Sequence, residues 1–124
     1  MGWIIIYFFD TYSIIELIRG NKSYEKYEEQ EIITGILNLT ELYWIFLNKY
    51  NRKTADYWAK KLSFNIVNFT KIECIEATRY RHSRKKDDLS FVDCLGYILS
   101  IKNNIKFLTG DKHFEGLDNV EFVR

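Results

Sequence analysis

Residues 3–9 read Trp-Ile-Ile-Ile-Tyr-Phe-Phe and end on a single acid, Asp10. A continuous apolar and β-branched run is typical of a strand that is covered on both faces in a parallel sheet. We therefore expect Trp3–Phe9 to be a central strand. Asp10 stops the run after seven residues, too few to cross a bilayer or to form a signal peptide with its basic leader. We expect a cytoplasmic protein with no membrane association.

Outward from this strand, apolar runs alternate with segments of helical spacing. Further strands are predicted at Glu31–Thr34, Phe64–Phe69, Ile105–Leu108 and Val120–Val123. Helices are predicted at Thr11–Ile18, Lys22–Glu29, Asn51–Leu62, Ile72–Arg81 and Phe91–Ile101, and along the stripe Leu39, Leu42, Tyr43, Phe46 and Tyr50. This alternation indicates an α/β fold, a three-layer sandwich with a mostly parallel central sheet and helices on both faces. No linker signal interrupts residues 1–124, so we expect a single domain.

Composition narrows the class of protein. Hydrophobic residues make up 47% of the 124 residues and aromatic residues 17%, which is typical of a globular domain. The 18 Lys and Arg almost balance the 17 Asp and Glu, so any surface that attracts nucleic acid must be local. Cys74 and Cys94 lack zinc-site spacing and are too few for a disulfide framework, which predicts buried thiols in a reducing compartment.

Two acids lie just beyond the ends of predicted strands. Asp10 comes after Trp3–Phe9, and Asp111 comes shortly after Ile105–Leu108. Both should project from the carboxyl edge of the sheet, where ligands gather in α/β folds. An Asp that caps a helix or occupies a Gly-Asp turn is the simpler explanation for either acid alone.

Two more acids stand near predicted helix starts. Glu41 lies three residues after Asn38, and Asp93 lies three residues after Ser90. If Asn38 and Ser90 are N-caps, each acid lies in the first turn of its helix. These spacings also match capping boxes, which need no function. The two roles are compatible, because the positive end of a helix favours an ionised carboxylate.

A metal site accounts for the four acids as a set. Carboxylates that converge repel one another unless they are protonated or neutralised by a cation. Oxygen ligands without histidine favour Mg²⁺ or Mn²⁺ over Zn²⁺. Such ions activate water and stabilise charge on an attacked phosphate. We therefore expect a phosphodiesterase or nuclease.

Four short segments contain these acids, and the order and spacing of the segments are also informative. They are Phe9-Asp10-Thr11, Asn38-Leu39-Thr40-Glu41-Leu42, Leu89-Ser90-Phe91-Val92-Asp93 and Leu108-Thr109-Gly110-Asp111. Together they resemble a PIN domain. The likeness runs from Ile4 almost to the last residue, and its most specific part is Ser90–Phe114.

The resemblance implies a PIN-like sheet between helices and a metal-dependent endoribonuclease. In the VapC-like branch it implies the toxin of a type II toxin–antitoxin pair, a homodimer with an antitoxin partner and an RNA substrate. Carried over by position, the catalytic and metal-binding acids are Asp10, Glu41, Asp93 and Asp111. Thr11, Ser90 and Thr109 are nearby hydroxyls that position ligands or water.

One dense basic segment precedes the helix that carries Asp93. It contains Arg79, Arg81, Arg84, Lys85 and Lys86, with Tyr80 and His82 interleaved. Such a segment is a candidate for contacts with RNA phosphates. The alternative is a solvated helix end whose charges favour the negative end of the helix dipole. His113 lies near Asp111, but we leave it out of the catalytic set because a lone His in a polar loop is more often structural.

Two functions of other classes compete with the nuclease. A non-catalytic protein-binding module would keep the fold and use its acids as caps, with aromatic residues such as Trp44 and Trp58 on a partner-binding face. A receiver-like domain has the right size, but Lys112 and Asp10 fit its layout poorly. A solitary nuclease that is not a toxin is also consistent with the sequence.

Overall fold

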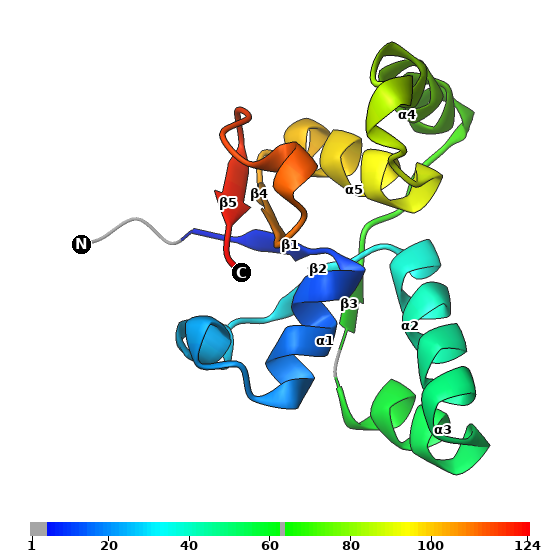
Figure 1. Ribbon diagram of the computed structural model, residues 1–124, viewed down its shortest axis with the longest axis vertical. Coiled ribbons are helices and arrows are strands. Elements are labelled where there is room, and N and C mark those ends of the chain that lie inside the picture. Colours follow the sequence, from blue (N-terminus) through cyan, green and yellow to red (C-terminus); the bar gives the residue numbers. More distant parts are fainter. Residues whose placement is uncertain (1–4, 63) are drawn as a thin grey trace.

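The computed structural model describes residues 5–62 and 64–124, and its chain path is shown in Figure 1. Five strands form one sheet in the order β3-β2-β1-β4-β5, and every pairing is parallel. The strands are β1 Tyr7–Phe9, β2 Ile32–Thr34, β3 Phe64–Ile66, β4 Lys106–Thr109 and β5 Val120–Phe122. The first strand lies at the centre, as its apolar sequence predicts.

The sheet lies between two groups of helices (Figure 1). The helices are α1 Thr11–Arg19, α2 Ile36–Lys49, α3 Arg52–Lys61, α4 Lys71–Ser83 and α5 Phe91–Lys102. Short 3₁₀ segments are η1 Lys22–Tyr27, η2 Lys85–Asp87 and η3 Lys112–Phe114. Within the described residues no helix is both long and apolar enough to cross a bilayer.

The alternating directions of the side chains along β1 explain why helices pack on both faces of the sheet. Tyr7 and Phe9 pack into the core shared with α1, α2 and α3. Phe8, between them, packs into the core shared with α4 and α5. Successive side chains of a strand point to opposite faces, so three buried aromatic residues anchor helices on both sides. The predicted α/β sandwich is confirmed.

The central strand is shorter than the apolar run predicts. Trp3 and Ile4, the start of that run, lie outside the described residues. Ile5 and Ile6 are about half exposed, at 47% and 45%. The run is therefore covered on both faces only at Tyr7–Phe9. The β3 strand is also shorter than predicted and ends at Ile66 instead of Phe69.

The charged segment Lys22–Glu29 is not the helix that the sequence predicts. It forms the 3₁₀ segment η1, in which Tyr24 and Tyr27 are fully buried. The Tyr24 hydroxyl donates to the carbonyl of Val123, and the Tyr27 hydroxyl donates to Glu121. Contacts with the last strand and the residue after it, remote in sequence, bury these two aromatic rings.

The start of α2 also differs from the prediction. The helix begins at Ile36 with Gly35 as its N-cap, so Asn38 is inside the helix and is not a cap. A side chain at Gly35 would place its Cβ 3.1 Å from Asn38 Oδ1 and 3.6 Å from Phe8 Cζ. The capping-box interpretation of Asn38 and Glu41 is therefore wrong, and Glu41 lies in the second turn.

Candidate active-site pocket

A pocket of about 510 Å³ contains all four predicted acids in its lining. Its described lining consists of Asp10, Thr11, Tyr12, Ile15, Glu41, Ile45, Asp93, Gly110, Asp111, Lys112, His113 and Arg124. Pairing of β1 with β4 aligns Phe9 with Leu108. The acids that follow these two strands therefore meet at the carboxyl edge of the sheet, while α2 and α5 supply the other two.

Asp10 is the most deeply buried of the four acids, with 2% of its surface exposed. It is the N-cap of α1, where its Oδ1 accepts a hydrogen bond of 2.8 Å from the amide of Ser13. Burial raises the pKa of Asp10 to about 7, although Thr109 and Ser13 lower it, and the charge of Asp93 raises it further. Capping uses one carboxylate oxygen, so the cap and a ligand site are compatible.

Asp93 lies in the first turn of α5, as predicted. Ser90 is the N-cap, and its hydroxyl accepts from the Asp93 amide at 3.0 Å. Burial raises the pKa of Asp93 to about 6, Ser90 lowers it, and the charges of Glu41 and Asp111 raise it. The carboxylate of Asp93 thus lies in the electric field of two other acids of the set.

Asp111 belongs to the turn between β4 and η3. Its Oδ1 accepts from the backbone amide of His113 at 2.9 Å and lies 2.8 Å from Nδ1 of the His113 ring. The amide of Asp111 donates to the Thr109 hydroxyl at 3.1 Å. Within residues 5–62 and 64–124, no hydrogen bond reaches the second carboxylate oxygen of Asp111. The turn therefore holds one oxygen and leaves the other available.

Gly110 has a steric role in this turn. A Cβ atom at Gly110 would lie 2.1 Å from Cε1 of Tyr12, so the Tyr12 ring occupies the space that a side chain would need. Tyr12 also lines the pocket. The glycine of Thr-Gly-Asp therefore lets the Asp111 turn pack directly against α1.

The three predicted hydroxyls have different surroundings. Thr11 is buried, lines the pocket, and accepts a 3.2 Å hydrogen bond from Nδ2 of the buried Asn38. Thr109 is buried next to Asp10 and Asp111. Ser90 caps α5 and does not line the pocket. Asn38, predicted only as a cap, instead orients Thr11.

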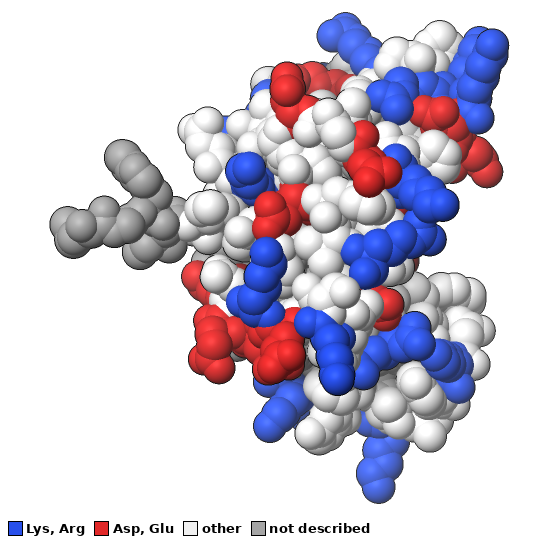
Figure 2. Space-filling view, turned by 60° about the vertical axis from the view of Figure 1, so that its left-hand side comes forward, with Lys and Arg blue, Asp and Glu red and all other residues white. Residues whose placement is uncertain are grey.

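The basic segment divides into two kinds of side chain. Arg81 donates through Nε to the carbonyl of Leu89 at 2.7 Å, and Arg84 makes three hydrogen bonds. Arg79, Lys85 and Lys86 are exposed, and their side chains form no hydrogen bond or ion pair with any described residue. Figure 2 shows Lys and Arg intermingled with Asp and Glu over the visible face. Only part of the segment is therefore free to meet a ligand.

Seven lining residues were not predicted as site residues: Tyr12, Ile15, Ile45, Gly110, Lys112, His113 and Arg124. Proximity to Asp111 was the one available signal for Lys112 and His113, whereas no local pattern identifies Arg124. Lys112 and Arg124 bring positive charge to an acidic pocket. Among the described residues, no group of three or more His, Cys, Asp or Glu side chains already stands in an arrangement able to hold a metal ion.

Comparison with known proteins agrees with the fold. The family model described as PIN domain matches residues 7–120. No curated protein sequence matches the chain significantly. Among solved structures, a toxin–antitoxin complex from Klebsiella pneumoniae is similar, with a TM-score of 0.70, 17% identity, and coverage of 94% of this chain and 95% of that one.

Two further structures share the fold. VapBC2 of Rickettsia felis, bound to a DNA fragment from its promoter, has a TM-score of 0.66 and 16% identity, covering 97% of this chain and 100% of that one. VapC20 of Mycobacterium tuberculosis, described as a toxin that cleaves the sarcin–ricin loop, has a TM-score of 0.72 and 15% identity, covering 95% of this chain and 99% of that one.

Proposed function

The chain belongs to the PIN domain family, and on that premise we propose that it is a metal-dependent endoribonuclease that hydrolyses phosphodiester bonds of RNA. Proteins of this family are generally nucleases. The observation that carries the proposal is the convergence of Asp10, Glu41, Asp93 and Asp111 on one pocket. Helix capping explains Asp10 singly, but capping does not require four acids to share a pocket.

The donor set fits a hard divalent cation. Burial and mutual repulsion raise the pKa values of Asp10 and Asp93, so the ionised pocket is costly by itself and is stabilised by a positive ion. Carboxylate and hydroxyl oxygens are the ligands that Mg²⁺ and Mn²⁺ prefer. We infer that Asp10, Glu41, Asp93 and Asp111 hold one or two such ions, which when bound activate water and stabilise charge on the attacked phosphate.

Other residues of the chain hold the acids and the substrate. Thr109 lies between Asp10 and Asp111, Ser90 holds the first turn of α5, and Thr11 offers a hydroxyl inside the pocket. Arg79, Lys85 and Lys86 are exposed and are suited to contact RNA phosphates. Phosphate contacts supply affinity without sequence information, so these residues would not select the cleavage site.

Cleavage of RNA by the purified protein tests this proposal. We expect cleavage with Mg²⁺ or Mn²⁺, none with chelator, and a loss of about 100-fold or more in Asp10→Asn, because a metal site contributes several kcal/mol to the transition state. Glu29→Gln, an exposed acid outside the pocket, is the matched control and should cleave normally. Cleavage that neither chelator nor Asp10→Asn reduces would come from a contaminating nuclease and would exclude the mechanism.

We further propose that the protein acts in the cytoplasm as the toxin of a type II toxin–antitoxin pair. The similar folds in toxin–antitoxin complexes support this proposal. An apolar groove of about 430 Å³ also supports it, since the groove shares Ile15 and Ile45 with the acidic pocket and continues to Phe46 and Trp58. An antitoxin segment in this groove would reach the pocket and block it.

The toxin proposal has a direct test. Expression of the chain alone should arrest growth of the host, and co-expression of a small DNA-binding protein encoded directly upstream should relieve the arrest. Asp10→Asn should be harmless with or without that protein. Light scattering of the purified chain should give the mass of a homodimer. If the wild-type enzyme is active but does not affect growth, the protein is a solitary nuclease and not a toxin.

A non-catalytic binding module remains the competing function. Calorimetric titration with Mn²⁺ distinguishes the two, because the nuclease should bind the ion and Asp93→Asn should bind it much more weakly. No binding by the wild type, or equal binding by the variant, would favour the module.

A further inference from the structure

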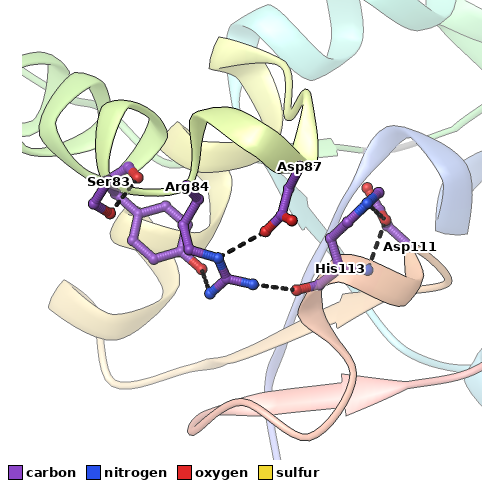
Figure 3. Close-up of polar contacts among 6 residues, drawn as sticks. Ser83, Arg84, Asp87, Asp111 and His113 are labelled. Carbon is purple, nitrogen blue, oxygen red and sulfur yellow. Dashed lines mark hydrogen bonds and ion pairs between the residues drawn. The ribbon is translucent and has the colours of Figure 1, made fainter.

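Two arginines of the basic segment hold backbone next to the acids of the pocket. Arg84 ends α4 as its C-cap, and Figure 3 shows its guanidinium between Asp87 and the backbone of His113. Nε donates to Asp87 Oδ2 at 2.8 Å, Nη1 to the Tyr80 hydroxyl at 3.1 Å, and Nη2 to the His113 carbonyl at 3.2 Å. Three separate acceptors fix the position of the guanidinium.

The contact with His113 leads directly to Asp111. The amide and the ring Nδ1 of His113 both lie within 2.9 Å of Asp111 Oδ1. Figure 3 shows the ring folded back onto the carboxylate. Because Arg84 holds the carbonyl of the same residue, it restrains the backbone that orients Asp111.

Arg81 holds the neighbouring acid-bearing segment in the same way. Its Nε donates to the carbonyl of Leu89, which is buried and directly precedes Ser90, the N-cap of α5. Asp93 lies in the first turn of that helix. The helix α4 and its C-cap residue thus contact the backbone before Asp93 and the backbone after Asp111.

We propose that Arg81 and Arg84 are positioning residues of the acidic pocket. Arg84 acts on Asp111 through His113, and Arg81 acts on Asp93 through Leu89 and Ser90. This differs from phosphate binding, the role that the sequence predicts for the whole basic segment. The guanidinium of Arg84 satisfies three fixed acceptors at once, which a lysine cannot reproduce. Arg81 makes a single contact, with the carbonyl of Leu89.

This proposal rests on the proposed function, because it assumes that the pocket holds a divalent ion. Titration with Mn²⁺ tests that assumption. We expect Arg84→Gln, Arg84→Lys and Arg81→Ala each to weaken Mn²⁺ binding about tenfold, the lower end for residues that orient metal ligands. Lys85→Gln is the matched control, because it removes an exposed charge one residue away. It should weaken RNA binding at low salt and leave Mn²⁺ binding unchanged.

A metal-free measurement separates positioning from the nuclease function. The chain has two histidines, His82 and His113, so a ¹H–¹⁵N spectrum of the imidazole rings is simple, and His82→Gln assigns it. In Arg84→Gln the His113 ring signals should shift toward those of a solvated imidazole, because the ring loses its fixed place on Asp111. Asp87→Asn removes the negative charge that faces the guanidinium and weakens this contact, so it should cause a smaller shift in the same direction, even if Arg84→Gln folds poorly.

The outcomes are distinguishable. If the wild type binds no Mn²⁺ but the His113 signals shift, the proposed function fails while the positioning contact stands. If the His113 signals are unchanged, or if Arg84→Lys binds Mn²⁺ as the wild type does, Arg84 acts as a charge and the positioning role is overturned. If the arginine variants lose only RNA affinity, both residues are phosphate contacts.

Discussion

At the scale of single residues, Asp10 is both the N-cap of α1 and a member of the acidic pocket. Its Oδ1 satisfies the first turn of α1, and asparagine is an equally good N-cap. Burial nevertheless raises the pKa of its carboxyl to about 7. In the metal-free protein, the negative charge of Asp10 therefore destabilises the folded state, whereas the shape of the side chain does not.

This cost predicts a pH-dependent effect of Asp10→Asn on stability. The pKa of Asp10 is raised in the folded state, so between about pH 4 and about pH 7 the folded chain keeps a proton that the unfolded chain has lost, and stability falls as pH rises. Asp93, with a pKa of about 6, adds to the trend. Around pH 8, Asp10→Asn should be more stable than the wild type by a few kcal/mol, and around pH 5 the gain should be much smaller.

Urea unfolding in the presence of chelator, at both pH values, measures this difference. Glu29→Gln is again the control and should match the wild type at each pH. If Asp10→Asn and the wild type are equally stable at the higher pH, the ionised carboxylate of Asp10 does not destabilise the folded state. A more stable but inactive variant is the expected signature of an acid kept for function.

At the scale of elements, the close packing of α5 against the sheet depends on Gly96. A Cβ atom there would lie 3.0 Å from ring atoms of both Phe8 and Phe107. The helix therefore packs closer to β1 and β4 than a larger residue allows. Gly96 lies one turn after Asp93 in the same helix, so a displacement of α5 at this contact would also move Asp93.

We predict that Gly96→Val destabilises the protein by about 1–3 kcal/mol, the usual cost of overpacking a core. Displacement of α5 should also weaken Mn²⁺ binding. Helix propensity alone favours valine over glycine by a few tenths of a kcal/mol, roughly, so a loss of stability in Gly96→Val reports on packing. Chemical denaturation and Mn²⁺ titration check the result, and an unchanged or increased stability would show that Gly96 carries no packing constraint.

At the scale of the whole molecule, the acidic pocket joins distant parts of the chain. Asp10, Glu41, Asp93 and Asp111 come from the ends of β1 and β4 and from two helices in different layers. An ion that binds all of them would tie the two layers together and stabilise the folded state by mass action.

Thermal unfolding should therefore depend on the metal. Mn²⁺ at about 100 times its dissociation constant should add about 2.7 kcal/mol of stability, which raises the melting temperature by several degrees for a domain of this size. Asp10→Asn combined with Asp93→Asn should melt at the same temperature with and without Mn²⁺. Scanning calorimetry measures both, and a shift that persists in the double variant would place the ion elsewhere.

The sequence by itself determined the features that depend on neighbouring residues. The apolar run ending at Asp10 predicted a buried parallel strand, and Tyr7–Phe9 form it at the centre of the sheet. The spacing of Ser90 and Asp93 predicted a capped helix, and α5 begins there. Strand periodicity and N-caps are local, so short windows of sequence contain the information they need.

Only the tertiary structure decided which side chains meet across long separations. Asn38 fits the local pattern of a cap, yet it is buried against Thr11 because α2 packs beside α1. Arg84 looks like a free basic residue, yet it is bound to the backbone of His113, 29 positions away. Such contacts depend on how the layers pack, and packing is a property of pairs of distant segments that no single stretch of sequence contains.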